Sequence, residues 1–283
     1  MRSDFIFNFT EAKHRHDQCI NILHSFTREI VENRRKTVLE EDEESEINLE
    51  DDSVGIKKKL ALLDVLLKSS IDGKPLTNPE IAEEVDTFMF EGHDTVTSAL
   101  TFGFYLLSRN PEAQQKIYEE VTGIVGDDLS VYPTFNQLQD MKFVELCIKE
   151  TLRMYPPVPI YGRNLDEDID LDGRIVPKGT NLNMNIYNVN MDPNNFENPE
   201  EFIPERFNEA NARHENPFVY VPFSAGPRNC VGQKFAMLEL KSAFCNVVRN
   251  FELLPGKIPV KLLLQLTLKS STGIHVGFRK RNP

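Results

Sequence analysis

The order of apolar and polar positions predicts a chain built mainly from helices. Apolar residues recur at helical spacing over residues 10–35, and a shorter apolar stretch over 56–67 is typical of a second helix. A third helix is expected to begin at Asn78-Pro79, where asparagine caps and proline suits the first turn, and to reach Ser108. It would stop ahead of Asn110-Pro111, because the residue before a proline disfavours helical angles. At about 30 residues this helix would be roughly 45 Å long, which is unusual for a globular protein.

The second half of the chain alternates helices with short strands. Helices are predicted over residues 111–124 and 142–155, and strand-like alternation with turn residues follows over 158–186. An amphipathic run over residues 231–253 predicts a further helix, and the tail over 261–278 is β-like. The predicted fold class is therefore mainly α with a small β portion.

A strongly acidic segment interrupts the first part of the chain. Nine of the thirteen residues from 40 to 52 are aspartate or glutamate, and the formal net charge of the chain is −12. Such a run predicts a solvated, flexible connector, since the spacing and glycine of an EF-hand calcium loop are missing. The net charge argues against a general nucleic-acid binder. We therefore expect a helical segment plus acidic connector over residues 1–55 and a core over residues 56–283.

The cysteines and the apolar runs indicate the compartment. Cys19, Cys147, Cys230 and Cys245 are far apart in the sequence, and none forms a C-x-x-C pair. This spacing favours neither a disulfide framework nor a zinc site, and it fits a reducing compartment. The apolar runs are short and broken by charges, so neither a signal peptide nor a membrane span of ~20 residues is predicted. The chain as written is expected to be soluble or peripherally bound.

One cysteine, Cys230, lies in a loop whose composition favours a thiolate. It follows a glycine/proline turn and precedes an amphipathic run, so backbone N–H groups and the positive end of a helix would surround the sulfur. Gly226 and Gly232 permit backbone angles and close approaches that a side chain would block. Phe223 can shield the sulfur from water, and Arg228 can pair with a nearby anionic group. A thiolate offered to an axial position of haem iron needs these conditions.

Cys230 has two other possible interpretations. A lone cysteine is most often a small buried hydrophobe. Phosphatase chemistry would need an arginine six residues after the cysteine, where Ala236 stands. Five typed positions at fixed spacing would arise by chance in a chain of this length on the order of once in ten thousand cases. The spacing therefore favours the metal ligand.

A second group of residues lies inside the long predicted helix. On a helical wheel Glu91, Gly92 and Thr95 lie within about 100° of arc. Asp94 lies at the margin of that arc, and His93 points elsewhere. A glycine in mid-helix costs about 1 kcal/mol relative to alanine, so we expect a compensating reason. That reason is either simple helix packing or the close approach of a flat cofactor with room for a diatomic ligand.

A third group combines a glutamate with arginines. Glu150 and Arg153 are three residues apart and share one helix face with Phe143 and Leu146, which predicts a buried pair. Buried charges need full satisfaction, because desolvation costs several kcal/mol per ion. Arg206 could complete a Glu–Arg–Arg network. The alternative is an ordinary surface pair, which is what most isolated E-x-x-R patterns are.

The loop over residues 223–232 resembles the cysteine loop of the cytochrome P450 family, and the other two groups match that family in order. The resemblance implies the cytochrome P450 fold from its long central helix through the cysteine-ligand loop and the following helix. It implies haem b as the cofactor, with the Cys230 thiolate as axial iron ligand and residues 56–283 as the haem-binding core. Arg163 and Arg228 are the implied partners of the haem propionates. The Glu–Arg–Arg network would hold the coil that positions the cysteine loop.

The segment Glu91-Gly92-His93-Asp94-Thr95 resembles the oxygen-activation segment of the same family. By that resemblance Asp94 and Thr95 would relay protons to dioxygen, which suits a carboxylate reachable by water and a hydroxyl that both donates and accepts. Most relatives carry a small residue where Glu91 stands. Glu-Gly-His-Asp-Thr instead resembles family 4, the fatty-acid ω-hydroxylase group, in an insect-like form. In that group the glutamate can form an ester bond to a haem methyl, which is our hypothesis for Glu91.

The resemblance also implies an activity and partners. The reaction would be a monooxygenase reaction that inserts one oxygen atom from O₂ into a C–H bond of a fatty acid or a similar lipophilic substrate. Electrons would come from NADPH through NADPH–cytochrome P450 reductase, with cytochrome b5 as a further candidate partner. The full-length family sits on the cytosolic face of the endoplasmic reticulum membrane. The alternatives are an inert truncated fragment that binds haem or a partner, and a haem-thiolate isomerase or dehydratase that needs no electron donor.

Nearly the whole chain takes part in the resemblance, but it corresponds only to the C-terminal part of the family's architecture. The membrane anchor, the first β-sheet, the early helices and a helix bearing tryptophan and arginine have no counterpart in the sequence. We therefore expect either a fragment or a naturally shortened product, with poor stability and an exposed apolar surface. Relatives usually carry His-Arg where Asn190-Met191 stands, a departure expected to weaken a local polar contact.

Overall fold

The structure is a computed structural model that describes residues 4–47, 61–208 and 216–281. The chain forms two compact units, Met1–Glu91 and Gly92–Pro283, and we describe each by itself. The division falls inside one long helix, α4 (Asn78–Arg109). The sequence suggested a division near residue 55, which lies outside the described residues.

The first unit is built around a long helix and a small apolar core. Its elements before α4 are α1 (Asp4–Phe7), α2 (Glu11–Ile47), α3 (Leu62–Leu67), β1 (Ser70–Ile71) and β2 (Lys74–Pro75). Val31 and Val38 of α2 are buried against Leu67, Ile81 and Ala82. The expectation that α2 ends near residue 35 is wrong. Residues 40–47 of the acidic run are helical, as the good helix propensity of glutamate allows, and the rest of that run lies outside the described residues.

Local sequence signals explain how α4 begins. Asp72 and Gly73 adopt positive φ angles of 51° and 75° in the turn between β1 and β2, the pattern of a tight Asp-Gly hairpin. The helix cap is Thr77 and not the expected Asn78, because Thr77 and Glu80 bond reciprocally. The Thr77 N–H donates to Glu80 Oε2 over 2.8 Å, and the Glu80 N–H donates to Thr77 Oγ1 over 3.5 Å. Helix α4 then ends at Arg109, one residue beyond the predicted Ser108.

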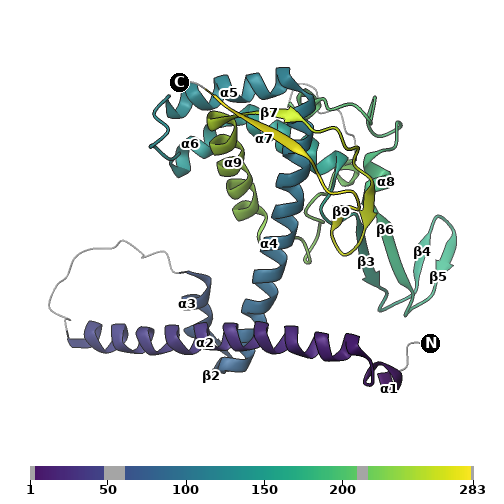
Figure 1. The fold of residues 1–283 in the computed structure, drawn as a ribbon. Coiled ribbons are helices and arrows are strands. Elements are labelled where there is room, and N and C mark those ends of the chain that lie inside the picture. The colour runs from purple at the N-terminus through teal and green to yellow at the C-terminus, as the bar shows by residue number, and fades with distance from the viewer. Residues whose placement is uncertain (1–3, 48–60, 209–215, 282–283) are drawn as a thin grey trace. The chain divides into compact units, whose positions relative to one another are not determined.

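The second unit packs helices beside the C-terminal part of α4 (Figure 1). Phe244 lies against α4 at Gly103, where an added Cβ would come within 2.4 Å of the Phe244 ring, so this helix pair approaches too closely for alanine. The largest buried cluster of the unit includes Val96, Ile148 and Val248. The helices are α5 (Pro111–Val125), α6 (Phe135–Asp140), α7 (Lys142–Met154), α8 (Ile186–Asn190) and α9 (Gln233–Asn250), with 3-10 turns over Pro204–Phe207 and Pro217–Val219.

In the described part of the second unit, four antiparallel strand pairs accompany the helices. Strands β3 and β6 pair with Arg163 opposite Leu182, and β7 and β10 pair with Leu253 opposite Phe278. The predicted mainly α fold with a small β portion is confirmed. Helix α9 ends before the predicted residue 253, and α6 was not predicted. The strands are β3 (Ile160–Asn164), β4 (Ile169–Leu171), β5 (Arg174–Val176), β6 (Asn181–Asn185), β7 (Phe251–Pro255), β8 (Leu262–Leu264), β9 (Leu268–Ser270) and β10 (Val276–Lys280).

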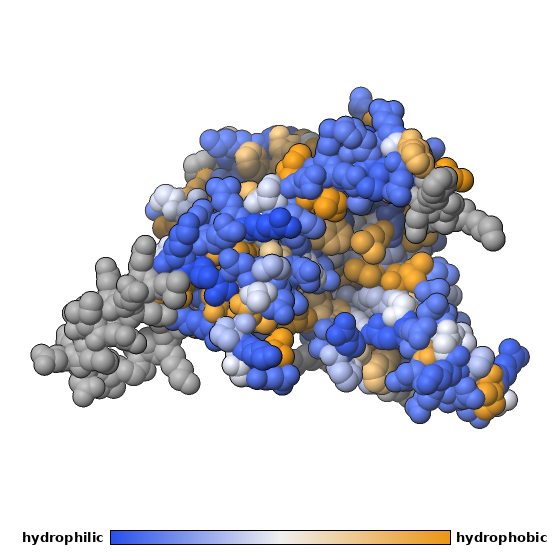
Figure 2. All heavy atoms as spheres, turned by 90° about the horizontal axis from the view of Figure 1, so that it is seen from below, coloured by the Kyte–Doolittle hydropathy of each residue, from blue (hydrophilic) through white to orange (hydrophobic). Residues whose placement is uncertain are grey.

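The surface exposes large apolar side chains. Val231 is 78% exposed, Phe235 is 73% exposed and Leu266 is 72% exposed. Figure 2 shows apolar patches in orange between the hydrophilic areas of one face. Among the residues that the structure describes, every helix is too short or too polar to span a bilayer.

Candidate functional site

The Cys230 loop presents its thiol at the start of α9. Cys230 is exposed and forms no disulfide. Its N–H donates to the carbonyl oxygen of Phe223 over 2.9 Å, which closes the loop. Gly226 has a φ of +79°, which a side chain would strain, and a Cβ at Gly232 would lie 3.9 Å from the Cys230 sulfur. The loop therefore holds one accessible sulfur beside the N-terminus of an 18-residue helix.

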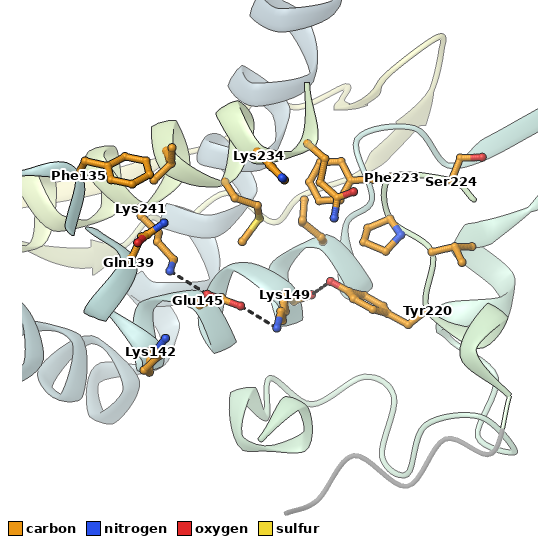
Figure 3. Close-up of a pocket in the computed structure, with 16 residues that line it drawn as sticks. Phe135, Gln139, Lys142, Glu145, Lys149, Tyr220, Phe223, Ser224, Lys234 and Lys241 are labelled. Carbon is orange, nitrogen blue, oxygen red and sulfur yellow. Dashed lines mark hydrogen bonds and ion pairs between the residues drawn. The ribbon is translucent and has the colours of Figure 1, made fainter. Parts of the chain in front are cut away.

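Two tyrosines that sequence reasoning missed anchor the segment leading into this loop. The Tyr161 hydroxyl lies 2.9 Å from the carbonyl oxygen of Val221 and 2.8 Å from that of Pro222. The Tyr220 hydroxyl donates to the carbonyl oxygen of Lys149 in α7 over 2.8 Å (Figure 3). Burial raises the pKa of Tyr161 to about 12, so its hydroxyl stays a donor at neutral pH. These bonds tie the loop to β3 and α7.

The first of the two candidate propionate partners also reaches the loop. Arg163 Nη2 donates to Ser224 Oγ over 3.0 Å, and Arg163 Nη1 donates to the carbonyl oxygen of Gly162 over 2.8 Å. Arg228 is exposed on the loop itself, two residues before Cys230. Arg163 therefore contacts the loop and Arg228 belongs to it, and a guanidinium group can pair with an anionic ligand.

The structure brings Glu150, Arg153 and Arg206 together in one network. Glu150 and Arg153 are both 0% exposed. Arg153 Nε and Nη2 donate to the two Glu150 carboxylate oxygens over 2.8 and 2.9 Å. Arg206 Nε donates to Glu150 Oε1 over 3.0 Å. The alternative of an ordinary surface pair is wrong, because both charges are buried and bonded in a fork geometry.

The network extends to Asn190, at the departure from the family pattern. Arg153 Nη1 donates to the Asn190 carbonyl oxygen over 2.9 Å, and Asn190 Nδ2 donates to the Arg153 carbonyl oxygen over 3.0 Å. Asn190 is 0% exposed. Within the described residues its Oδ1 accepts no hydrogen bond.

The glycine in the middle of α4 faces open space. A Cβ added at Gly92 would meet no atom within 4 Å in the described residues, whereas one at Gly103 would collide with Phe244. Helix packing therefore accounts for Gly103, and no described residue packs against Gly92. The open surface at Gly92 fits the approach of a flat group. Glu91, the last residue of the first unit, is exposed in the same helix.

Asp94, one of the two candidate proton-relay residues, is held by two partners from the end of the chain. Thr267 Oγ1 donates to Asp94 Oδ2 over 2.5 Å, and Lys269 Nζ donates to Asp94 Oδ1 over 3.0 Å. The hydrogen bond from Thr267, followed by that from Lys269, lowers the pKa of Asp94. Thr95, the second relay candidate, is half-buried beside it in α4. No local sequence pattern predicts the contacts of Thr267 and Lys269 with Asp94.

A cavity of about 900 Å³ lies between α7, α9 and the segment that leads into the Cys230 loop (Figure 3). Its charged lining is predominantly basic. Glu145 lies between two of the lysines, with Nζ–Oε distances of 2.8 Å to Lys149 and 2.8 Å to Lys241. Burial raises the pKa of Glu145, but these two lysines outweigh that effect and bring it to about 2. Lys142 and Lys234 add exposed positive charge to the same rim.

The chain is similar in sequence and fold to known proteins. The family model described as "Cytochrome P450" matches residues 1–276. Cytochrome P450 4d2 of Drosophila melanogaster is 47% identical over 283 residues, which cover 99% of this chain and 56% of that protein. Cytochrome P450 4e5, mitochondrial, of Drosophila mettleri is 46% identical over 255 residues, which cover 90% of this chain and 48% of that protein. The chain thus spans about half the length of the curated relatives it matches.

A solved structure has the same fold. The crystal structure of the cytochrome P450DA heme domain superimposes with a TM-score of 0.72 at 29% identity. The superposition covers 78% of this chain and 50% of that chain.

Proposed function

Because this chain belongs to the cytochrome P450 family and resembles members of family 4, we propose that its protein is a haem-thiolate monooxygenase with Cys230 as the axial ligand. The net reaction is RH + O₂ + NADPH + H⁺ → ROH + H₂O + NADP⁺. The observation that carries the proposal is the exposed, unbridged Cys230 in a glycine-bounded loop at the start of α9. On the resemblance to family 4, R is the chain of a fatty acid or a similar lipophilic molecule, and the full-length protein acts at the endoplasmic reticulum membrane.

The residues around Cys230 fit a haem. When bound, haem supplies the oxygen-activating and electron-accepting chemistry, which a thiolate ligand favours. Cys230 would ligate the iron, and Arg163 and Arg228 would pair with the propionates. Phe223 would keep water from the sulfur. Among the described residues no atom lies within 4 Å of a Cβ added at Gly92, which supports its role on the cofactor-facing side of α4.

Asp94 and Thr95 would relay the protons that the reaction consumes. The hydrogen bonds from Thr267 and Lys269 lower the pKa of Asp94, so its carboxylate is ionised near neutral pH and readily releases a proton that it has taken up from solvent. The Thr95 hydroxyl can accept one hydrogen bond while it donates another, which lets it hand the proton onward. Both residues are consecutive in α4, so the backbone fixes the separation of their Cα atoms.

Glu91 is the proposed site of covalent attachment. Its carboxylate would form an ester with a haem methyl, as the resemblance to family 4 suggests. Denaturing solvent extraction tests this directly, because an ester-linked haem stays with the polypeptide. In a Glu91→Ala variant the haem should be extracted completely. Complete extraction of haem from the unaltered protein would contradict the ester.

The basic cavity supports docking of an electron donor on the cysteine side. NADPH–cytochrome P450 reductase and cytochrome b5 are the proposed donors, and an acidic docking surface would complement Lys142 and Lys234. Charge reversal at these two lysines should raise the KM for the reductase, mainly at low salt. A Lys261→Glu control, placed on an exposed residue outside the cavity, should leave that KM unchanged.

Turnover in ¹⁸O₂ tests the proposed reaction. The haem-loaded protein is mixed with reductase, NADPH and a fatty acid, and the product is analysed by mass spectrometry. One ¹⁸O atom per product molecule, with a strict need for NADPH, is expected. Conversion without NADPH would instead identify an isomerase or dehydratase. Haem binding without any turnover would identify an inert fragment.

A further inference from the structure

Three consecutive residues near the end of the chain attach to the helix that carries the proposed proton relay. Thr267 and Lys269 hold the two carboxylate oxygens of Asp94. Between them, the carbonyl oxygen of Leu268 accepts a hydrogen bond from Ser98 Oγ over 2.8 Å. Asp94 and Ser98 are four residues apart, so they lie on one face of α4. Residues 267–269 therefore contact α4 through three neighbouring hydrogen bonds.

We propose that Thr267 and Lys269 are positioning residues of the proton relay, with Thr267 as the fixed anchor of the Asp94 carboxylate and Lys269 as its releasable partner. The inference rests on the proposed function, in which Asp94 accepts and passes on a proton. Neither residue touches a reacting atom, and each acts through Asp94.

The two partners of Asp94 differ in burial. Thr267 is 3% exposed, and its bond to Asp94 Oδ2 is a charge-assisted one in a water-poor setting. The Lys269 side chain is 47% exposed, and solvent-exposed ion pairs contribute little to stability and open readily. Opening the Lys269 contact frees Asp94 Oδ1 while Thr267 still fixes Oδ2. Oδ1 is thus the oxygen at which the proton is exchanged.

The main chain around these side chains is fixed independently of them. The Leu268 N–H donates to the carbonyl oxygen of Pro157 over 2.8 Å, and Leu268 itself is 1% exposed. Removing the Lys269 ammonium should therefore leave the backbone and Thr267 in place. A change at Lys269 acts on the charge beside Asp94 and not on the fold of β9.

The charged groups that face Asp94 act in one direction. Lys269 faces Asp94 from β9, and His93 precedes Asp94 in α4. The Thr267 hydroxyl donates to the carboxylate and so favours its ionised form. Without Lys269, the Asp94 pKa should rise toward its ordinary value, so Asp94 takes up its proton at a higher pH.

The test compares Lys269→Met, Lys269→Arg and Thr267→Val with a Lys261→Met control in the haem-loaded protein. The first readout is independent of turnover: the infrared carboxyl band of Asp94, assigned by its loss in Asp94→Asn, is followed as the pH is lowered. Lys269→Met should shift the midpoint upward by up to about one pH unit, a tenfold change in proton affinity. Lys269→Arg should restore it, and Lys261→Met should not move it.

The second readout is the share of NADPH electrons recovered in product instead of hydrogen peroxide, together with the solvent deuterium isotope effect on turnover. Lys269→Met should change both several-fold while the thermal unfolding midpoint stays at that of the control. Thr267→Val should lower the recovered share further. If Asp94→Asn is impaired but Lys269→Met and Thr267→Val match the control, the positioning inference is overturned. If Asp94→Asn itself keeps normal recovery, the relay in the proposed function fails.

Discussion

Replacing Glu150 by glutamine should strongly destabilise the second unit. The carboxylate is fully buried and accepts hydrogen bonds from Arg153, Arg206 and the Ile203 N–H. Removing one partner of a buried ion pair costs about 3–5 kcal/mol, because the remaining charge is left uncompensated. Because Arg153 keeps its hydrogen bonds to the carbonyl oxygens of Asn190 and Glu201, we expect the free energy of unfolding to fall by about 3 kcal/mol. Against a typical domain stability of about 5–15 kcal/mol, that is a large share.

Urea unfolding followed by circular dichroism measures the loss by linear extrapolation. The matched control is Glu252→Gln, because Glu252 pairs with Arg279 at the surface, with side chains 38% and 62% exposed. The control should show no measurable change. The Glu150→Ala protein should also fail to incorporate haem, since the network holds the coil ahead of the Cys230 loop, and a normal haem spectrum would contradict this role. If Glu150→Gln is no less stable than Glu252→Gln, the reasoning about the buried network is refuted.

Three further predictions concern the surroundings of the site. The pKa of Glu145 is lowered to about 2 from an ordinary 4.5, so its lysine pairs stabilise the fold above about pH 4.5, and this contribution should disappear as the pH falls toward 2. In a Glu145→Gln variant the free energy of unfolding should no longer fall between about pH 4.5 and pH 2 by the amount that Glu145 contributes. An unchanged pH dependence would contradict the lowered pKa of Glu145. Gly103→Ala should cost about 1–3 kcal/mol in urea unfolding because of the Phe244 contact, whereas Gly92→Ala should leave the haem-free chain at least as stable and weaken haem binding. Equal losses for both variants would refute this contrast. Tyr161→Phe should accelerate haem loss, measured by transfer to a haem-scavenging protein, and a wild-type rate would show that its hydroxyl does not hold the loop.

Elements with local signals were predictable from the sequence. The start of α4 near Asn78-Pro79 and its end before Asn110-Pro111 follow from capping and proline rules, and the structure agrees within one residue at each end. Helix α6 was overlooked although Thr134 and Gln137 form a capping box that the sequence contains.

The end of α9 was not predictable by periodicity. Phe251, Leu253 and their neighbours continue the apolar pattern of the helix, yet they pair as β7 with β10, where Leu253 faces Phe278. The apolar spacing suits either structure over so few residues, and the pairing partner, which decides between them, lies far along the chain.

Some contacts of the site were predictable from the sequence and others were not. Spacing and family resemblance together predicted that Glu150, Arg153 and Arg206 meet, and they do. Nothing local links Asp94 to Thr267 and Lys269, because more than 170 residues separate them in the sequence. Their contact is a product of tertiary packing, and only the structure reveals it.

The most direct test of the central claim is a carbon-monoxide difference spectrum of the reduced, haem-loaded protein. The unaltered chain should give the band of a thiolate-ligated haem, because Cys230 presents an unbridged sulfur at the start of α9. Cys230→Ala should lose that band, and Cys19→Ala, which alters another exposed cysteine, should keep it. Absence of haem from the unaltered chain, or a thiolate band that persists in Cys230→Ala, would contradict the account.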